Sequence, residues 1–153
     1  MSAALLDVNV LIALFHAAHI NHLEAHRWFG ANRRRGWATC PITINGCVRV
    51  LSNPRYPILS TTPGEVMTAL SNLCSAADHQ FWAEDVSLLD EQLFLPARIA
   101  GHQKITDVYL LGLAVRKRGV FVTFDRSIPY KAVVGADASH LRVLGGTAEA
   151  IEN

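Results

Sequence analysis

Three aspartates stand apart from the other acidic residues of the sequence, because each lies at the end of an apolar segment. Asp7 and Asp125 each follow a short apolar run, and Asp107 begins a longer one, whereas the other ten of the thirteen acidic residues lie in polar or helix-surface contexts. A carboxylate that is partly removed from water needs a partner. Three carboxylates that lie close together repel one another, and a divalent cation between them relieves the repulsion.

A ligand set made only of oxygen atoms favours Mg²⁺ or Mn²⁺ over zinc. Such ions activate a water molecule and stabilise negative charge on a phosphoryl group, so hydrolysis of a phosphodiester bond is the natural reaction class. The simpler interpretation is that each aspartate caps a helix or satisfies a loop. For any one of the three aspartates taken singly, this structural role is the favoured interpretation. It is less favoured for the three together, because all of them lie at the ends of predicted elements.

The segments that position these aspartates alternate between apolar, strand-like runs and helical patterns. Strands are predicted at residues 3–7, 37–40, 79–82, 120–124 and 141–144. Helices are predicted at residues 10–15 with Asn9 as the cap, 22–34, 41–51, 63–77 with Thr62 as the cap, 90–101 starting at Asp90, and 107–118 with Thr106 as the cap. This alternation predicts one α/β domain over residues 1–153, a three-layer α/β/α sandwich with a central parallel sheet. Sites in such sheets form beyond the C-terminal ends of the strands, where Asp7 and Asp125 lie.

Composition and charge narrow the class of protein. Half of the 153 residues are hydrophobic and the formal net charge is +1, so any nucleic-acid binding must depend on a local basic patch. The odd number of cysteines, Cys40, Cys47 and Cys74, argues against a disulfide framework and for a reducing compartment, with Cys40 and Cys74 as small buried residues. No apolar run approaches the roughly 20 residues that span a bilayer, and no signal peptide is evident. A cytoplasmic protein is expected.

Four segments of the sequence form a recognisable set: LLDVNVLIAL at 5–14, CPITINGCVRVLSNP at 40–54 apart from Ile44 and Cys47, HQKITDVYLLGLA at 102–114 and FVTFD at 121–125. Together they closely resemble the PIN-domain family, and more narrowly the VapC ribonuclease toxins of bacterial toxin–antitoxin pairs. The resemblance implies a metal-dependent endoribonuclease with Asp7, Asp107 and Asp125 as catalytic residues and as ligands of Mg²⁺ or Mn²⁺. It also implies a VapB-like antitoxin whose tail binds an apolar groove, an RNA substrate and a homodimer.

One position departs from the pattern of the toxins that the chain resembles. Where they carry Thr-Glu-Asn-Gly, this chain has Thr43-Ile44-Asn45-Gly46. Ile44 cannot bind a metal or hold a water, so the activity is expected to be weakened. Asn45 is adjacent, but neighbours on a helix point about 100° apart. The polar residues expected to support the site are Asn9, Thr43, Asn45, Thr106 and Thr123.

Two further clusters could carry function. His22 and His26 are four residues apart, near His16 and His19, but without a recognisable third ligand a surface or loop role is favoured over a metal site. The basic run Arg33, Arg34 and Arg35 could contact RNA phosphates or could be a solvated helix end. Trp28, Phe29 and Trp37 are expected in the core or at a partner interface.

Three classes of function therefore remain open on the sequence. The first is an RNA-cutting toxin, and the second is a PIN-fold protein that binds RNA or an antitoxin without cutting, because of Ile44. The third is an unrelated metal-dependent phosphatase or small-molecule enzyme, for which Asp7-Val8-Asn9 is only a partial match to the DxD motif. Fold alone does not separate these classes.

Overall fold

The computed structural model describes residues 2–56 and 60–145 and contains a five-stranded sheet in the order β3-β2-β1-β4-β5, with every neighbouring pair parallel. The strands are β1 (Ala4–Leu6), β2 (Trp37–Thr39), β3 (His79–Phe81), β4 (Val120–Thr123) and β5 (Leu141–Val143). Each predicted strand is present and is slightly shorter than predicted. The central strands β1, β2 and β4 are almost fully buried, as expected where a parallel sheet is covered on both faces.

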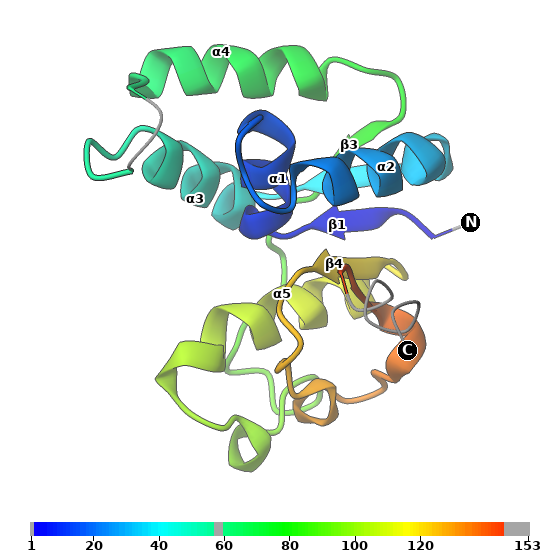
Figure 1. Ribbon diagram of the computed structural model, residues 1–153. Helices are drawn as coiled ribbons and strands as arrows, with labels where there is room; N and C mark the ends of the chain where they lie inside the picture. Colours follow the sequence, from blue (N-terminus) through cyan, green and yellow to red (C-terminus); the bar gives the residue numbers. More distant parts are fainter. Residues whose placement is uncertain (1, 57–59, 146–153) are drawn as a thin grey trace, which may run out of the picture.

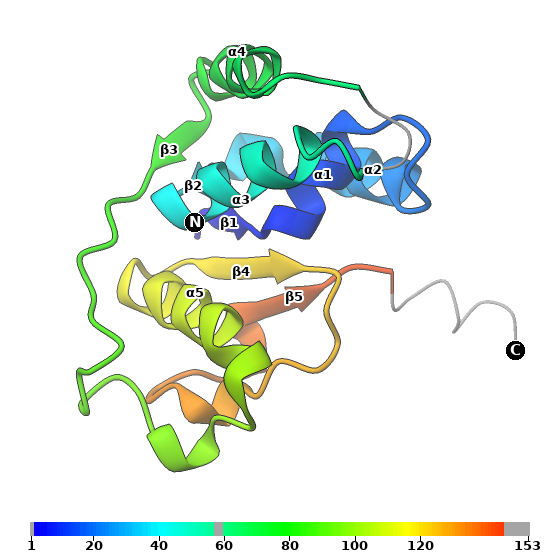
Figure 2. The ribbon, with the colours of Figure 1, turned by 90° about the vertical axis from the view of Figure 1, so that its left-hand side faces the viewer.

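Helices cover both faces of the sheet, so the predicted three-layer α/β/α sandwich is confirmed. The helices are α1 (Val8–Phe15), α2 (His22–Asn32), α3 (Pro41–Leu51), α4 (Pro63–Cys74) and α5 (Ile105–Arg116). Figures 1 and 2 show α1 to α4 on one side of the strands and α5 on the other. No helix in residues 2–56 or 60–145 is long and apolar enough to cross a membrane.

Alternation along the strands divides the core into two layers. On β1, Leu5 packs with the α5 layer, whereas Leu6 packs with the layer of α1 to α4. On β4, Phe121 and Val122 divide in the same way. Successive strand side chains point to opposite faces, so the two short strands bury apolar side chains on both sides and hold their own C-terminal ends in fixed positions.

The predicted helix from Asp90 to Gly101 is wrong. Asp90 instead begins a turn, accepting the backbone N–H of Gln92 on its side chain, and only Pro96–Arg98 forms a short 3-10 turn. The backbone around Leu93 pairs with another segment, because Val134 N donates to Leu93 O and Leu95 N donates to Ala132 O. These long-range hydrogen bonds replace the helical ones that the local sequence would allow. The predicted helix over residues 63–77 is capped by Thr62 as expected but ends at Cys74.

Helix α3 approaches the start of α1 closely, and Gly46 makes this approach possible. A β-carbon built on Gly46 would lie 2.6 Å from a methyl carbon of Val8, well inside van der Waals contact. Val8 is branched at its β-carbon and has little rotamer freedom in a helix, so it has little room to give way. Since Val8 directly follows Asp7, the glycine sets the distance between α3 and the end of β1.

Candidate acidic active site

The hydroxyl group of Thr123 connects the ends of the two central strands. Thr123 is fully buried at the end of β4, and its Oγ1 donates to Asp7 Oδ2 at 2.7 Å. The same oxygen accepts from the backbone N–H of Asp125 at 3.0 Å and from Asn9 Nδ2 at 3.2 Å. One side chain therefore fixes Asp7, at the end of β1, relative to the chain that carries Asp125.

Asp7 is both buried and the N-cap of α1. Its side chain is only 6% exposed, and its Oδ1 accepts from the backbone N–H of Val8 at 2.7 Å. Burial raises the pKa of Asp7, although the hydrogen bonds from Thr123 and Val8 act in the opposite direction, and the charge of Asp125 adds to the rise. The helix therefore begins at a carboxylate that is costly to keep ionised in the absence of a cation.

Asp107 lies in the first turn of α5 and is electrostatically coupled to both other aspartates. Its pKa is raised to about 6, first by burial and then by the negative charges of Asp7 and Asp125, with a further contribution from a side-chain hydrogen bond to Asp125. Lys104 lowers it only in part. The three carboxylates thus form one coupled group at the C-terminal edge of the sheet.

Asp125 is held by the two residues that follow it and by a nearby ammonium group. Its Oδ1 accepts from the backbone N–H of Ser127 at 2.8 Å and from the Ser127 hydroxyl at 2.6 Å. Lys104 Nζ lies 3.5 Å from Asp125 Oδ2 and donates to Ser127 Oγ. The hydrogen bonds from Ser127 lower the pKa of Asp125, and Lys104 acts in the same direction. No sequence pattern singled out Ser127 or Lys104 as part of this site.

A metal ion matches the chemistry of this group, although the side chains do not yet form a metal site. Within the described parts of the chain, no three His, Cys, Asp or Glu side chains already make a group that could hold an ion. The donor atoms are nevertheless carboxylate oxygens, which Mg²⁺ and Mn²⁺ prefer. Burial, and then the charges of Asp7 and Asp125, raise the pKa of Asp107, and Lys104 offsets this only in part. The chemistry of the donor atoms therefore fits a hard divalent cation.

The supporting residues predicted from the sequence have different surroundings. Asn9 does not cap α1; it lies within that helix and joins α1 to β4, since its Oδ1 accepts from Phe124 N at 3.2 Å. Thr43 is buried and closes the first turn of α3, where its hydroxyl binds the backbone of Cys40. Asn45 and Thr106 are exposed. Thr106 is not the cap of α5, because the helix already begins at Ile105. Thr123 therefore binds the acidic group directly, and Asn9 is linked to it through Thr123.

Ile44 is half-buried on α3 and packs against the apolar layer formed by α1 to α4. Val8, next to Asp7, packs against the same layer. The side chain is thus part of the packing between α3 and α1, and it brings no polar atom to the acidic group.

The three arginines of the basic run have different environments. Arg33 is bound to Asp78 through two hydrogen bonds of 2.7 and 3.1 Å, and this pairing lowers the pKa of Asp78 to about 2. Arg34 and Arg35 are exposed in a short 3-10 turn that precedes β2. This turn lies at the opposite end of β2 from the acidic group.

His16 and His19 lie between α1 and α2, whereas His22 and His26 lie in the first two turns of α2. His22 Nδ1 lies 2.7 Å from Ala13 O, and His26 Nε2 lies 2.8 Å from Leu14 O. The imidazoles therefore satisfy carbonyl groups at the end of α1, which have no partner within that helix. This structural role agrees with the favoured interpretation of the cluster.

Comparison with known proteins identifies the family. The PIN domain family profile matches residues 4–134, which include all three aspartates. This chain belongs to the PIN domain family. Ribonuclease VapC44 of Mycobacterium tuberculosis is 46% identical over 144 residues, covering 92% of this chain and 99% of the relative. Ribonuclease VapC39 of the same organism is 42% identical over 132 residues, covering 86% and 95%.

A solved structure supports the same fold. The crystal structure of M. tuberculosis VapC20, described as a toxin that cleaves the sarcin–ricin loop, superposes with a TM-score of 0.60 at 11% sequence identity. The match covers 88% of this chain and 98% of VapC20. At this identity the likeness concerns the fold alone. The PIN domain described here therefore has the family's architecture, with its acidic group at the edge where this class of sheet forms its sites.

Proposed function

We propose that this PIN domain is a metal-dependent endoribonuclease, the toxin of a type II toxin–antitoxin pair, and that it acts in the cytoplasm. The observation that carries the proposal is the gathering of Asp107 with Asp7 and Asp125, where burial and then the charges of the other two carboxylates raise the pKa of Asp107 to about 6. Such perturbed carboxylates gather at functional sites. The relatives VapC44 and VapC39 are named ribonucleases, which supports RNA as the substrate class.

Each residue of the group has a distinct task in this proposal. Asp7, Asp107 and Asp125 would hold Mg²⁺ or Mn²⁺, which when bound supplies an activated water and stabilises charge on the scissile phosphate. Thr123 fixes the orientation of Asp7 through a hydrogen bond, and Asn9 donates to the same Thr123 oxygen. Ser127 keeps Asp125 ionised by donating two hydrogen bonds to it. Asp7 and Asp125 are thus held in place before the substrate binds, which lowers the cost of reorganisation during the reaction.

The test of this proposal is cleavage of a structured RNA by the purified chain during a manganese titration, with excess chelator as the control. Cleavage that requires the metal and is lost in chelator supports the proposal. RNA that stays intact at every metal concentration, with a folded protein, contradicts it and favours the alternative function. That alternative is a PIN protein that binds RNA or an antitoxin without cutting, and the half-buried, apolar Ile44 is the observation in its favour.

A VapB-like antitoxin is part of the same proposal, as is a homodimer of the chain. An open groove with a volume of about 220 Å³ lies between the end of α1, the end of α3 and α4. Its lining includes Phe15, Leu51 and Val66, so it presents apolar surface to solvent. Amphipathic segments that fold on binding commonly use such grooves.

Lys104 is expected to compete with the metal ion for the acidic group. Its ammonium lies 3.5 Å from Asp125 Oδ2 and is 22% exposed, so it partly compensates the charge that a metal would compensate. Replacing Lys104 with methionine should therefore tighten Mn²⁺ binding about three- to fivefold, the size expected for a largely solvent-screened ion pair. Calorimetric titration with MnCl₂ measures this without any substrate. Lys104→Arg keeps the charge and should bind Mn²⁺ as the wild type does; equal affinity of the methionine variant would contradict the competition.

A further inference from the structure

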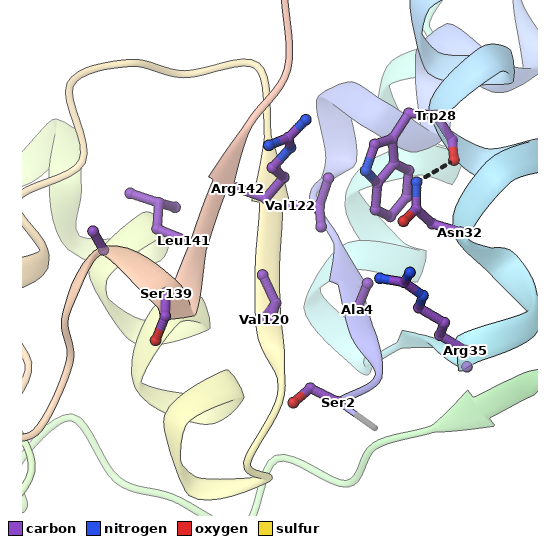
Figure 3. A pocket seen from close by; sticks show the side chains of 12 residues that line it. Ser2, Ala4, Trp28, Asn32, Arg35, Val120, Val122, Ser139, Leu141 and Arg142 are labelled. Carbon is purple, nitrogen blue, oxygen red and sulfur yellow. Dashed lines mark hydrogen bonds between the residues drawn. The ribbon is translucent and has the colours of Figure 1, made fainter.

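A groove on the sheet face between α2 and β5 lies outside the acidic group and has no role in the mechanism proposed above. Its volume is about 460 Å³. The floor is formed by β1 and β4, through Ala4, Val120 and Val122. Among the described residues, β5 has its main contacts with β4 and with the 3-10 turn Ala138–His140. Figure 3 shows Arg142 on one wall and Trp28 and Arg35 on the other.

The charge of this groove is positive. None of the described residues that line it is acidic, and two of them, Arg35 and Arg142, are exposed arginines. Within residues 2–56 and 60–145, neither guanidinium takes part in a salt bridge. Arg33, in contrast, is bound to Asp78. The groove therefore presents two guanidinium groups that can each bind a phosphate oxygen through paired N–H donors.

An aromatic side chain lies on the same wall of the groove as Arg35. Trp28 is half-buried on α2 and lines the groove, while the hydrogen bond from Asn32 Nδ2 to Trp28 O, 2.8 Å long, ties this part of the wall together. The hydroxyl residues Ser2 and Ser139 also line the groove. Cations that bind phosphates beside an exposed aromatic ring that stacks on a base are the combination by which proteins hold single-stranded nucleic acid.

We propose that this groove binds a single-stranded segment of the RNA substrate, with phosphates on Arg35 and Arg142 and a base against Trp28. The inference deepens the proposed nuclease function and rests on it for the choice of RNA. The floor strands are the ones that lead to the catalytic carboxylates. Asp7 and Asp125 lie three residues beyond Ala4 and Val122, about 10 Å along an extended strand. RNA bound in the groove would therefore run along these strands from the N-terminal end of the sheet, where Arg35 lies, toward the acidic group.

The test is RNA binding in the presence of a chelator, so that cleavage plays no part. A 12-nucleotide single-stranded RNA is titrated against the full chain over a range of KCl concentrations, with tryptophan fluorescence as the signal. Trp37 and Trp82 are buried, so quenching should come from Trp28 and should vanish in Trp28→Phe. Arg35→Gln with Arg142→Gln should weaken binding roughly tenfold and reduce the salt slope by about 1.4, the value for two phosphate contacts to a single strand.

The matched control is Arg55→Gln with Arg98→Gln, which removes the same charge from exposed arginines that do not line the groove. Equal RNA affinity of the two double variants would overturn the proposal. So would quenching of Trp28 by an acidic peptide but not by RNA, which would assign the groove to a protein partner. A chain that binds RNA here with the predicted salt slope, yet never cuts it, would instead contradict the proposed nuclease function and leave this inference intact.

Discussion

Replacing Asp107 with asparagine is expected to lower RNA cleavage by about two to four powers of ten, the usual loss when a positioned acid–base group or metal contact is removed. The same change should stabilise the metal-free protein at neutral pH by about 1 to 2 kcal/mol. Asp107 has a pKa of about 6 because it is buried beside two other carboxylates, so its charge opposes folding. One pKa unit corresponds to about 1.4 kcal/mol, and solvent screening reduces the total for a half-buried group.

The pH dependence of this stabilisation has a defined sign. The pKa of Asp107 is higher in the folded chain than its ordinary value of 3.8, so the folded state binds the proton more tightly. The stability that the proton provides is complete below about pH 4 and is lost as the pH rises through about 6. Asp107→Asn and wild type should therefore unfold at similar temperatures near pH 4, should diverge as the pH rises from about 4 to about 6, and should stay apart above pH 6, with the variant more stable.

Thermal unfolding in chelator and RNA cleavage with Mn²⁺ measure the two effects. Asp85→Asn is the control, because Asp85 is exposed and pairs with Lys117 at 3.1 Å, away from the acidic group. It should leave cleavage unchanged and should give no stabilisation. If Asp107→Asn cleaves RNA at the wild-type rate, the carboxylate is not part of the machinery. A loss of cleavage without stabilisation at pH 7 would mean that the three charges are not coupled as described.

Replacing Ile44 with glutamate is expected to raise the cleavage rate about 10- to 100-fold at limiting Mn²⁺, a part of the effect of a fully positioned catalytic base. The new carboxylate would add an oxygen near the start of α1, where the wild type has an apolar side chain packed in the layer of α1 to α4. Because Ile44 is half-buried in that layer, the substitution should also destabilise the fold by about 1 kcal/mol, as typical substitutions do.

Ile44→Gln distinguishes the effect of the negative charge of Ile44→Glu from the effect of side-chain size and shape. Glutamine has nearly the same volume as glutamate and should cost similar stability, but it should not raise the cleavage rate. Cleavage is followed on a structured RNA across a manganese titration, with unfolding measured on the same samples. If the wild type cuts as fast as Ile44→Glu at saturating metal, while Asp7→Ala abolishes cutting, then the three aspartates suffice and Ile44 has only a packing role.

Local sequence patterns determined the elements of this protein well where burial and periodicity agree. Consecutive residues around Phe121 are apolar, so side chains that point to both faces of a strand would be buried. This pattern is typical of a strand covered on both faces, and the segment forms β4. Thr62 and Pro63 together define the start of α4, since the hydroxyl accepts a free backbone N–H and proline needs none. Asp7 and Asp125 were recognisable because a carboxylate directly after a buried strand lies where parallel sheets form their sites.

Tertiary structure decided the features that depend on distant partners. The segment from Asp90 is not helical, because its backbone pairs with residues near Val133, which no local pattern reveals. Asn9 joins α1 to β4 because Thr123, which is 114 residues away in sequence, is brought beside it. Arg33 and Arg35 cannot be distinguished by their positions in the basic run. The fold pairs Arg33 with Asp78 and places Arg35 at the lining of an open groove.

The acidic group illustrates both contributions. Residue types and spacing selected Asp7, Asp107 and Asp125, because ionisable groups next to buried segments are costly and call for a partner. Their pKa values were not readable from the sequence, since each depends on burial and on the distances between charges from separate elements. The fold places Lys104 and Ser127 beside Asp125 and leaves Asp107 between two carboxylates. Short-range order thus follows from the local sequence, whereas electrostatic coupling follows from packing between elements that are distant along the chain.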